Sequence, residues 1–383
     1  MSKTEVSGRH TIVIAEIGTS HGGSLDKAKR LADAAAEAGA DCIKFQWVYA
    51  SEILHPDTGF VNLPGGKTRL YDRFTELETD SAFFEKMRDY VRSLKKTFMC
   101  SPFGEKSMHE LFALRPDYIK IASPELNHYP LLKLLTELEQ TLPAEKRIPV
   151  VLSSGVSKMK DIVKALELLE PLKENVPEGF EPLSLLHCIT SYPAPPEEYN
   201  LSLIPYYRSR FGIPSGVSDH SLDPKIVPVI AVMCGAQFIE KHITLERSGS
   251  GLDDPVALPP DRFALMTESV RRFEKLDFQS ALKLANEEFG RKLVERVIGN
   301  GKKELAPSEK ANYGRTNRSI HFMRDMKKGS VIGPHDIAVL RTEKELSVGI
   351  SPEYYEKLIG MTLTMDARSG EGLQWKHVGT QLG

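Results

Sequence analysis

Short apolar runs alternate with amphipathic segments from residue 11 to about residue 276, and this alternation limits the possible folds more than any other feature. In the longer segments apolar residues recur every three or four positions, as at Leu25, Ala28 and Leu31, which predicts helices. The short runs are continuously apolar, as in parallel strands that are buried on both faces. Eight such runs predict strands at 11–18, 42–46, 97–103, 118–123, 149–154, 183–189, 213–219 and 238–244.

Eight strand–helix units predict an α/β fold, the (β/α)8 TIM barrel, in which active sites form at the carboxyl ends of the strands. An open doubly wound sheet is the alternative, and it is disfavoured because no Gly-x-Gly-x-x-Gly follows the first run. We predict a barrel domain at 1–285, a linker at 286–318 and a compact β-rich domain at 319–383. The Lys, Glu, Arg, Gly and Asn content of the linker favours a solvated connector over a packed layer.

The composition excludes several classes of protein. The chain has 383 residues and a formal net charge of −2, so its overall charge does not favour a nucleic-acid partner. No apolar stretch approaches the ~20 residues that a membrane span needs, and we expect a cytoplasmic protein with no membrane partner. The four cysteines are far apart in apolar surroundings, which favours buried free thiols.

Polar side chains end or follow the predicted strands, and in a barrel these ends converge on one mouth. They are Glu16, Lys44, Gln46, Ser101, Lys120, Ser123, Glu125, Ser153, Thr190, Tyr192, Ser218, His220 and His242. Two lysines and a ring of hydroxyls suit a ligand with a carboxylate and a phosphate, because these groups must replace the water that the anions lose. Lys44 and Lys120 lie inside buried strands, where an unpaired ammonium is costly, so binding is favoured over an exposed rim position.

The histidines differ in what their positions predict. His220 and His242 end neighbouring strands, where neutral imidazoles can share one divalent metal, although hydrogen-bonded structural histidines are the alternative. Asp219 is a candidate to orient an imidazole. For His21, in the turn 18–23, a turn-stabilising and a substrate-contacting role stay equally open, whereas His187 is expected to have a core or supporting role.

Nine short motifs, in order along nearly the whole chain, resemble those of the sialic acid synthase family, which includes spore-coat polysaccharide homologues. They are Ala15-Glu16-Ile17-Gly18, Ile43-Lys44-Phe45-Gln46, Ser101-Pro102-Phe103, Lys120-Ile121-Ala122-Ser123, Leu152-Ser153-Ser154-Gly155, Leu186-His187-Cys188, Tyr192-Pro193, Ser218-Asp219-His220-Ser221 and Glu240-Lys241-His242. The resemblance implies a TIM barrel followed by an antifreeze-like SAF domain at 319–383.

The resemblance also implies an activity. Members of the family condense phosphoenolpyruvate with an N-acetylated hexose such as N-acetylmannosamine to make a nonulosonic acid and phosphate. A divalent ion, Mn²⁺ with Mg²⁺ or Co²⁺ as alternatives, activates the sugar aldehyde. The family forms domain-swapped homodimers, so Arg341 of the SAF domain is expected to reach the partner's substrate.

Residue roles follow from the matching motifs. His220 and His242 are implied as metal ligands and, with Glu16, as the catalytic set. The implied phosphoenolpyruvate contacts are Lys44, Ser101, Lys120, Ser123, Ser153 and Ser218. The implied residues of the sugar and metal site are Glu16, Gln46, Glu125, Thr190, Tyr192 and Asp253.

Four positions depart from the family pattern. Ser20 replaces an asparagine, Thr190 replaces another, Asp254 replaces a histidine and Thr342 replaces a proline. All four are expected on the sugar side, which leaves the acceptor open between mannosamine, legionaminate and pseudaminate precursors. Two alternatives remain: a non-catalytic barrel that binds a sugar or a partner, and a synthase that joins phosphoenolpyruvate to another aldose.

Overall fold

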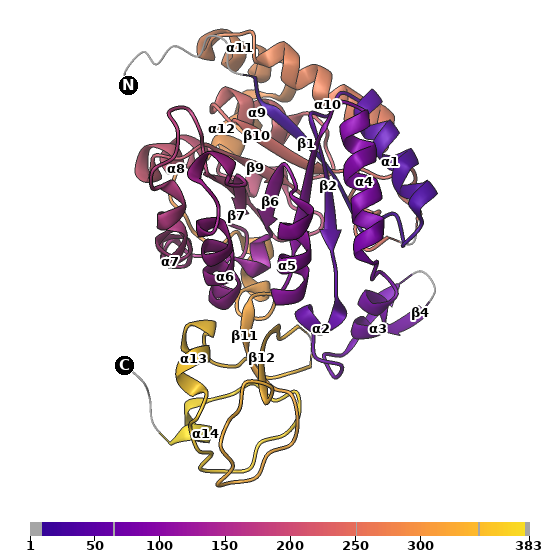
Figure 1. Cartoon of the computed structure of the whole chain (residues 1–383). Coiled ribbons are helices and arrows are strands. Elements are labelled where there is room, and N and C mark those ends of the chain that lie inside the picture. Colours follow the sequence, from indigo (N-terminus) through magenta and orange to yellow (C-terminus); the bar gives the residue numbers. More distant parts are fainter. Residues whose placement is uncertain (1–9, 64–65, 250, 344, 380–383) are drawn as a thin grey trace.

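Eight parallel strands close into a barrel in the order β1-β10-β9-β8-β7-β6-β5-β2 (Figure 1). The structure is a computed structural model that describes residues 10–63, 66–249, 251–343 and 345–379. The barrel strands are β1 (Ile12–Gly18), β2 (Cys42–Trp47), β5 (Thr97–Pro102), β6 (Tyr118–Ile121), β7 (Val150–Ser153), β8 (Leu183–Cys188), β9 (Ser215–Asp219) and β10 (Phe238–His242). Each matches a predicted run to within a few residues, so the predicted barrel is confirmed and the open sheet is wrong.

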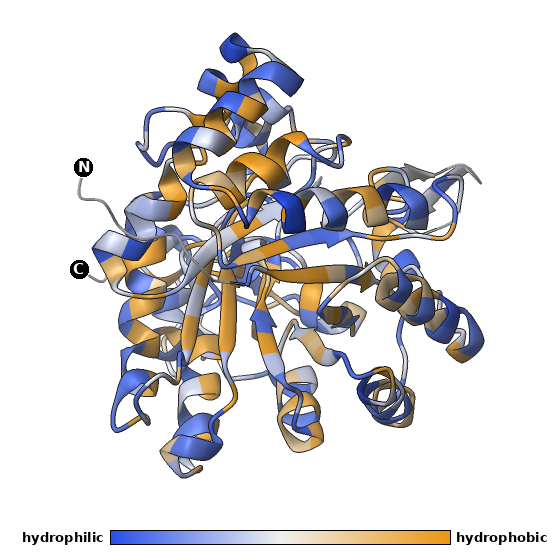
Figure 2. Cartoon of the chain, turned by 90° about the horizontal axis from the view of Figure 1, so that it is seen from above, coloured by the Kyte–Doolittle hydropathy of each residue, from blue (hydrophilic) through white to orange (hydrophobic). Residues whose placement is uncertain are grey.

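Helices surround the strands and turn their apolar faces inward, as the orange inner surfaces in Figure 2 show. In α1 (Leu25–Glu37) the Ser24 hydroxyl accepts the Lys27 N–H and caps the helix, while Ala28 and Leu31 are fully buried. The other helices around the barrel are α4 (Ser81–Ser93), α5 (Glu105–Leu114), α6 (Tyr129–Gln140), α7 (Met159–Leu169), α8 (Leu203–Phe211), α9 (Ile226–Met233) and α10 (Pro260–Phe273).

The inside of the barrel has an apolar floor and a polar layer above it. The floor is a cluster of six buried side chains: Ile14, Cys42, Met99, Val151, Leu186 and Phe238. Two residues further along their strands, Glu16, Lys44 and Glu240 face the same interior, because alternate residues of a strand share a face. The floor therefore seals one end of the barrel and leaves the polar layer toward the carboxyl ends of the strands.

The segment 286–318 packs against the barrel, so the expectation of a solvated connector is wrong. Helix α11 (Phe278–Phe289) crosses the predicted boundary at 285, and α12 (Arg291–Ile298) buries Val294 and Val297 completely. After a short 3-10 helix, η5 (Pro307–Asn312), the chain reaches the C-terminal domain. The prediction of solvent exposure failed because several charged residues of this segment bind backbone atoms of barrel loops. Lys303 Nζ, for example, donates to the Ser154 carbonyl at 3.0 Å.

The C-terminal domain is small and irregular. Strands β11 (Arg318–Phe322) and β12 (Ile337–Arg341) pair antiparallel. A 3-10 turn, η6 (Pro352–Tyr354), leads into α13 (Tyr355–Leu358). Thr362 forms an isolated antiparallel bridge with Val331. A last short helix is α14 (Trp375–Val378).

Smaller elements decorate the carboxyl ends of the barrel strands. Helices α2 (Ala50–Ile53) and α3 (Leu70–Thr75) flank a hairpin of β3 (Phe60–Leu63) and β4 (Gly66–Arg69), which the sequence analysis did not predict. A 3-10 turn, η1 (Ser123–Glu125), follows β6. Within the described ranges no helix has both the length and the apolarity to cross a membrane.

Gly216 of β9 gives a test of barrel closure. A Cβ at this position would lie 2.1 Å from the Phe238 carbonyl oxygen of β10, so the two strands could not keep their spacing. We expect Gly216→Ala to lower the free energy of unfolding by about 1–3 kcal/mol or more, the usual cost of overpacking. Urea unfolding measures the change. The control is Gly333→Ala, whose Cβ would meet only the Asp336 side chain, at 3.3 Å; equal stability of both variants would contradict the prediction.

Candidate active site

Four charged side chains from four strands meet inside the barrel. Lys44 Nζ lies 2.9 Å from Glu16 Oε1 and 3.3 Å from Glu240 Oε1. Lys120 Nζ lies 3.7 Å from Glu240 Oε1. No side chain of the four is more than 5% exposed. The two ammonium groups and two carboxylates therefore neutralise one another where water hardly reaches.

These ion pairs set the protonation of the cluster. Burial alone would raise the pKa of Glu240, but Lys120 and Lys44 lower it to about 2. Burial would lower the pKa of Lys44, yet Glu16 and Glu240 raise it above its ordinary value. Burial does lower the pKa of Lys120, which Glu240 offsets only in part. Lys120 is thus the less neutralised of the two lysines, and an anionic ligand would stabilise it more.

The sequence argument missed Glu240, although one signal could have found it. Glu240 lies two residues before His242 on β10, so both face the interior. Lys241 lies between them and faces outward, where its Nζ is 2.6 Å from Asp219 Oδ2. Asp219 also accepts the Ser221 N–H at 2.8 Å. The prediction that Asp219 orients an imidazole is therefore wrong, since its carboxylate binds Lys241 and Ser221 instead.

The two predicted metal ligands lie side by side at the mouth. The ring centroids of His220 and His242 are 5.6 Å apart. Tyr192 stacks on His220 with centroids 4.2 Å apart and meets His242 nearly edge-on at 6.2 Å. Asp253 Oδ2 lies 3.8 Å from His242 Nδ1. The structure thus brings together four residues that the sequence placed on the sugar and metal side.

The donor set of these imidazoles fits a divalent cation. His220 Nδ1 lies 2.7 Å from the Ile189 carbonyl oxygen and donates to it, which leaves the Nε2 lone pair for a ligand when the ring is neutral. Burial lowers the pKa of His242 and favours its neutral ring. Burial would also lower the pKa of His220, but Cys188 and the Ile189 carbonyl raise it to about 9, so a cation would displace a proton there.

The number of protein ligands is also limited. Among the described residues, no group of three or more His, Cys, Asp or Glu side chains could hold a metal ion. A cation bound by His220 and His242 would therefore keep several coordination positions for substrate and water, as catalytic sites do.

Several buried polar atoms in the barrel mouth have no hydrogen-bond partner within the described chain. They are Ser101 Oγ, Ser153 Oγ, Thr190 Oγ1, Glu16 Oε2 and Glu240 Oε2. An unpartnered buried polar group costs about 1–3 kcal/mol, so a set of five around two lysines is typical of a site that a ligand completes.

Three other predicted residues are already bonded within the chain. Gln46 Nε2 donates to Glu16 Oε1 at 2.6 Å, and Ser218 Oγ donates to Glu240 Oε1 at 3.0 Å. Ser123 Oγ accepts the Gly155 N–H at 3.0 Å, and a Cβ on Gly155 would lie 2.2 Å from Thr190 Oγ1. These side chains orient the acids and the loop after β7, and their predicted contacts with substrate stay predictions.

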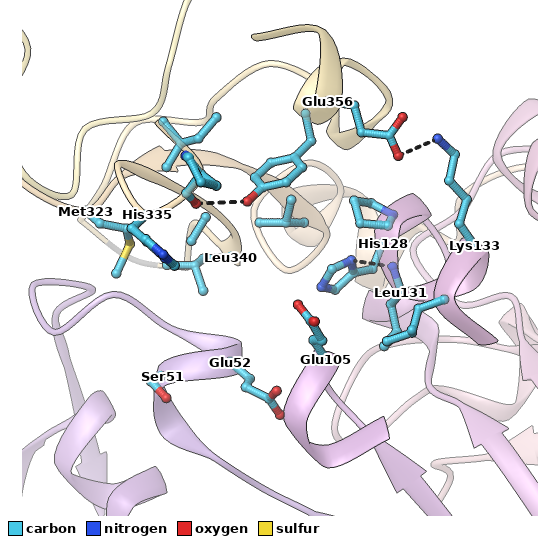
Figure 3. Close-up of a pocket in the computed structure, with 18 of the residues that line it drawn as sticks. Ser51, Glu52, Glu105, His128, Leu131, Lys133, Met323, His335, Leu340 and Glu356 are labelled. Carbon is cyan, nitrogen blue, oxygen red and sulfur yellow. Dashed lines mark hydrogen bonds and ion pairs between the residues drawn. The ribbon is translucent and has the colours of Figure 1, made fainter. Parts of the chain in front are cut away.

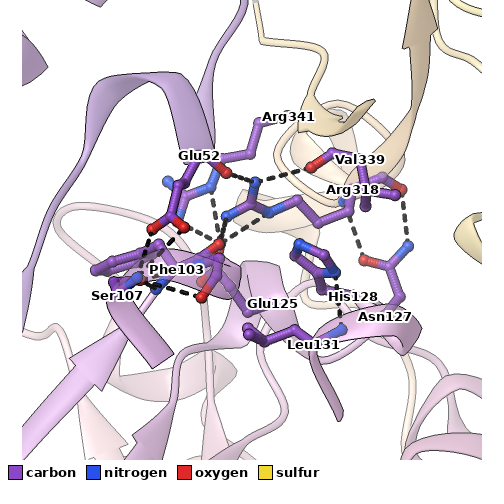
Figure 4. A network of polar contacts seen from close by, with 11 residues as sticks. Glu52, Phe103, Ser107, Glu125, Asn127, His128, Leu131, Arg318, Val339 and Arg341 are labelled. Atoms are coloured by element: carbon purple, nitrogen blue, oxygen red, sulfur yellow. Dashed lines mark hydrogen bonds and ion pairs between the residues drawn. The ribbon is translucent and has the colours of Figure 1, made fainter. Parts of the chain in front are cut away.

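Glu125 joins the barrel mouth to the C-terminal domain, as Figure 4 shows. Arg341 on β12 donates from Nε and Nη2 to Glu125 Oε1, at 3.1 and 2.7 Å. The Arg341 guanidinium also lies 5.6 Å from the centre of the Phe103 ring. Arg341 therefore meets the barrel of its own chain in this structure, and its predicted contact with a partner's substrate stays a prediction.

Two of the four departures from the family pattern bind each other. Ser20 Oγ donates to Asp254 Oδ1 at 2.7 Å, and Asp254 Oδ2 accepts the Gly251 N–H at 2.8 Å. This pair fixes the loop that carries Asp253 beside His242. Thr342, by contrast, is fully buried inside the C-terminal domain, 3.0 Å from Ser319 Oγ, so the expectation that it lies on the sugar side is wrong.

The other two histidines have structural surroundings. His21 Nδ1 accepts the Gly23 N–H at 3.0 Å and its ring packs on Phe83, with centroids 4.6 Å apart, which favours the turn-stabilising role. His187 is buried between Tyr199 and Tyr207, each with its ring centroid 6.3 Å away, as expected for a core residue.

A cavity of about 550 Å³ separates the C-terminal domain from α5 and α6 (Figure 3). Its walls include Glu105 and His128 from the barrel and Met323 from the C-terminal domain, and an ion pair of 2.8 Å between Lys133 and Glu356 spans it. None of the predicted catalytic or substrate residues lines this cavity. The chemistry is therefore assigned to the polar layer inside the barrel, where the unpartnered atoms lie.

Comparisons with known proteins agree with this geometry. The NeuB family model matches residues 31–280, and the SAF domain model matches residues 317–379. The chain is 31% identical over 380 residues to the spore coat polysaccharide biosynthesis protein SpsE of Bacillus subtilis, covering 98% of this chain and 96% of that protein. It is 29% identical over 381 residues to the N,N'-diacetyllegionaminic acid synthase of Legionella pneumophila, covering 98% and 97%. The crystal structure of the Bacillus subtilis spore coat protein matches with a TM-score of 0.78 and 29% identity over 99% of both chains.

Glu240→Gln tests the charge cluster. The variant leaves Lys120 without its carboxylate, and breaking a buried pair typically costs about 3–5 kcal/mol. We expect that loss in urea unfolding at pH 7. The pKa of Glu240 is lowered from 4.5 to about 2, so the stabilisation of the fold by its charge is complete above pH 4.5 and is lost as the pH falls toward 2. The difference in stability between Glu240→Gln and wild type should therefore shrink below pH 4.5.

The control is Glu356→Gln in the exposed pair with Lys133, which should cost at most about 1 kcal/mol. Equal stability of Glu240→Gln and wild type at pH 7 would contradict the pairing.

Proposed function

We propose, because this chain belongs to the NeuB family and carries a SAF domain, that it condenses phosphoenolpyruvate with an N-acetylated hexose. The product would be a nonulosonic acid of the sialic type, with release of phosphate. The single observation that carries the proposal is the buried pair Lys44 and Lys120 beneath unpartnered hydroxyls. Such a site can replace the hydration of a carboxylate and a phosphate on one small molecule.

His220 and His242 would hold the divalent cation. When bound, the cation would polarise the open-chain sugar aldehyde as a Lewis acid. The chain's own residues build the rest of that side of the site. Tyr192 supplies an apolar wall against the imidazoles, and Asp253 lies beside His242 to orient the ring. A sugar on this wall would face the phosphoenolpyruvate held by the lysines, because Glu16 and His242 are neighbours in the register of β1 and β10.

The reaction would begin as the C2–C3 π pair of phosphoenolpyruvate attacks the aldehyde carbon, which forms the carbon–carbon bond and leaves positive charge at C2. The C=O π pair of the aldehyde would move onto its oxygen, which takes up a proton and becomes a hydroxyl. Water would add to C2 and lose a proton to a base. Glu16 suits that role because its Oε2 is buried and unpartnered. The bond between C2 and the phosphate ester oxygen would then break, and its electrons would leave with the phosphate. The new hydroxyl on C2 would lose its proton and become the keto group. Lys44 and Lys120 would offset the charge of the phosphate.

The SAF domain would complete the site between two protomers, as the resemblance implies for a domain-swapped homodimer. The contacts that Arg341 makes with its own barrel would then be made between chains. Closure by this domain would exclude water from the mouth while the two substrates react.

A phosphate-release assay tests the function. Phosphate should appear only when phosphoenolpyruvate, Mn²⁺ and an acetamido-hexose are all present, and a chelator should stop it. His242→Ala should weaken metal binding by at least the ~10–100-fold that changes around metal ligands cause. Full turnover in chelator would reject the metal. Turnover with an aldose phosphate instead of an acetamido-hexose would favour the rival synthase, and no turnover with any sugar would favour a non-catalytic barrel.

Mixing two inactive variants tests the exchange of SAF domains. Lys120→Ala removes a barrel residue and Arg341→Ala removes a SAF residue, so a swapped mixed dimer would hold one site with both residues intact. We expect partial recovery of phosphate release after the subunits exchange, about a quarter of wild type for random exchange at equal mixing, because about half of the dimers are then mixed and each mixed dimer holds one intact site of two. No recovery, with exchange verified by a tagged subunit, would place Arg341 in the site of its own chain.

A further inference from the structure

Arg318 is the first residue of β11, and its side chain is fully buried between the two domains (Figure 4). Nε and Nη2 donate to Glu125 Oε1, at 3.2 and 2.9 Å. Nη2 also donates to the Phe103 carbonyl at 2.8 Å, and Nη1 donates to the carbonyls of Glu52 and Val339. All five N–H groups of the guanidinium therefore have acceptors, which come from the loops after β2, β5 and β6 and from β12.

The backbone of Arg318 is bonded as well. Asn127 Oδ1 accepts the Arg318 N–H at 2.9 Å, and Asn127 Nδ2 donates to the Arg318 carbonyl at 2.8 Å. Asn127 belongs to the barrel loop after η1, so this single side chain replaces a strand neighbour for the first residue of β11. The entry into the C-terminal domain is thus fixed on the barrel by both backbone and side chain.

Arg318 and Arg341 are direct partners in the β11–β12 register. Like charges directly opposite on a sheet repel each other, so the pair needs a shared anion. Glu125 Oε1 supplies it and accepts two N–H groups from each arginine. Glu125 Oε2, however, is buried and has no partner among the described residues. One oxygen of Glu125 is therefore committed to holding the SAF domain, and the other stays open to a ligand.

The second arginine has a different exposure. The Arg341 side chain is 12% exposed, whereas that of Arg318 is 0%. The two guanidinium groups on Glu125 thus differ in their surroundings: Arg318 is enclosed by protein, whereas part of Arg341 stays accessible.

We infer that Arg318 is a positioning residue that orients Glu125 and, through it, Arg341 for the acceptor sugar. The inference rests on the proposed function for its substrate, and it assigns a role to a residue in the segment that the sequence predicted to be solvated. Arg318 does not touch the reacting atoms. It fixes which oxygen of Glu125 faces the mouth and holds Arg341 on the same carboxylate. Loss of Arg318 should therefore weaken binding of the sugar and leave phosphoenolpyruvate binding at Lys44 and Lys120 unchanged.

Steady-state kinetics of Arg318→Met in the full-length protein tests the split between the substrates. The substitution keeps an unbranched side chain of similar reach and leaves Glu125 paired with Arg341. We expect the KM for the acetamido-hexose to rise about tenfold or more, in line with the effect of small misplacements, while the KM for phosphoenolpyruvate stays within about twofold. Arg318→Lys, which keeps the charge but not the planar fork, should fall between Arg318→Met and wild type.

Two further measurements distinguish a positioning role of Arg318 from a general loss of structure. Arg324→Met removes an exposed arginine of the same domain, which pairs with Asp336, and should leave both KM values at wild type. Hydrogen exchange of the amides in β12 should be faster in Arg318→Met than in Arg324→Met, with no change in β2 or β6. An unchanged sugar KM in both Arg318 variants, or an equal rise for both substrates with faster exchange throughout the barrel, would overturn the inference.

Failure of the proposed function gives a different result. Wild-type protein without synthase activity would reject the reaction, but the exchange measurement would still decide whether Arg318 holds β12 against the barrel. Wild-type protection of β12 in Arg318→Met would then overturn the positioning role independently of any substrate.

Discussion

The pairing of two lysines with two glutamates inside the barrel is the constraint on which the rest of the structure depends. A buried ammonium without a partner costs several kcal/mol, so Lys44 and Lys120 can lie above the apolar floor only because Glu16 and Glu240 are there. The pairing satisfies charge without satisfying hydrogen bonds, because one oxygen of each carboxylate has no partner in the described chain. The charges inside the barrel are therefore balanced before a ligand binds, and a bound ligand would supply the missing hydrogen bonds.

The approach to the C-terminal domain follows the same physical rule. Glu309 is fully buried, and its carboxylate accepts the N–H groups of Val156 and Thr190 at 2.9 and 2.8 Å. Lys303 and Arg318 donate to backbone carbonyls in the same region. Charged side chains of this segment thus satisfy backbone groups of the barrel loops that cannot pair within a strand or helix. Around Glu309 and Arg318 the domain junction is therefore a polar contact from which water is excluded.

The site contains residues at the positions of the family motifs and a contact between two positions that depart from the expected pattern. The lysines, the two imidazoles and Glu16 occupy the positions that the family motifs give them. The contact is the one between Ser20 and Asp254, whose Oγ and Oδ1 atoms lie 2.7 Å apart. The Ser20 hydroxyl gives the buried Asp254 carboxylate a donor, and Asp254 in turn accepts the Gly251 N–H, so the pair holds the loop of Asp253 in place.

The sequence by itself determined the barrel, because strand and helix periods are local properties that survive in any arrangement of neighbours. It also determined the inward side chains at the strand ends, such as Lys44, Lys120 and His242, since every strand end of a parallel barrel opens at the same mouth. Only the tertiary structure decided the partners. Glu240 with Lys120, Arg318 with Glu125 and Ser20 with Asp254 are separated by 120 to 234 residues in the chain, and no local pattern encodes such contacts. The charged residues of the segment 286–318 predicted a solvated surface, yet several of them are buried and bind the barrel loops. Burial depends on what packs against a side chain and not on its own polarity.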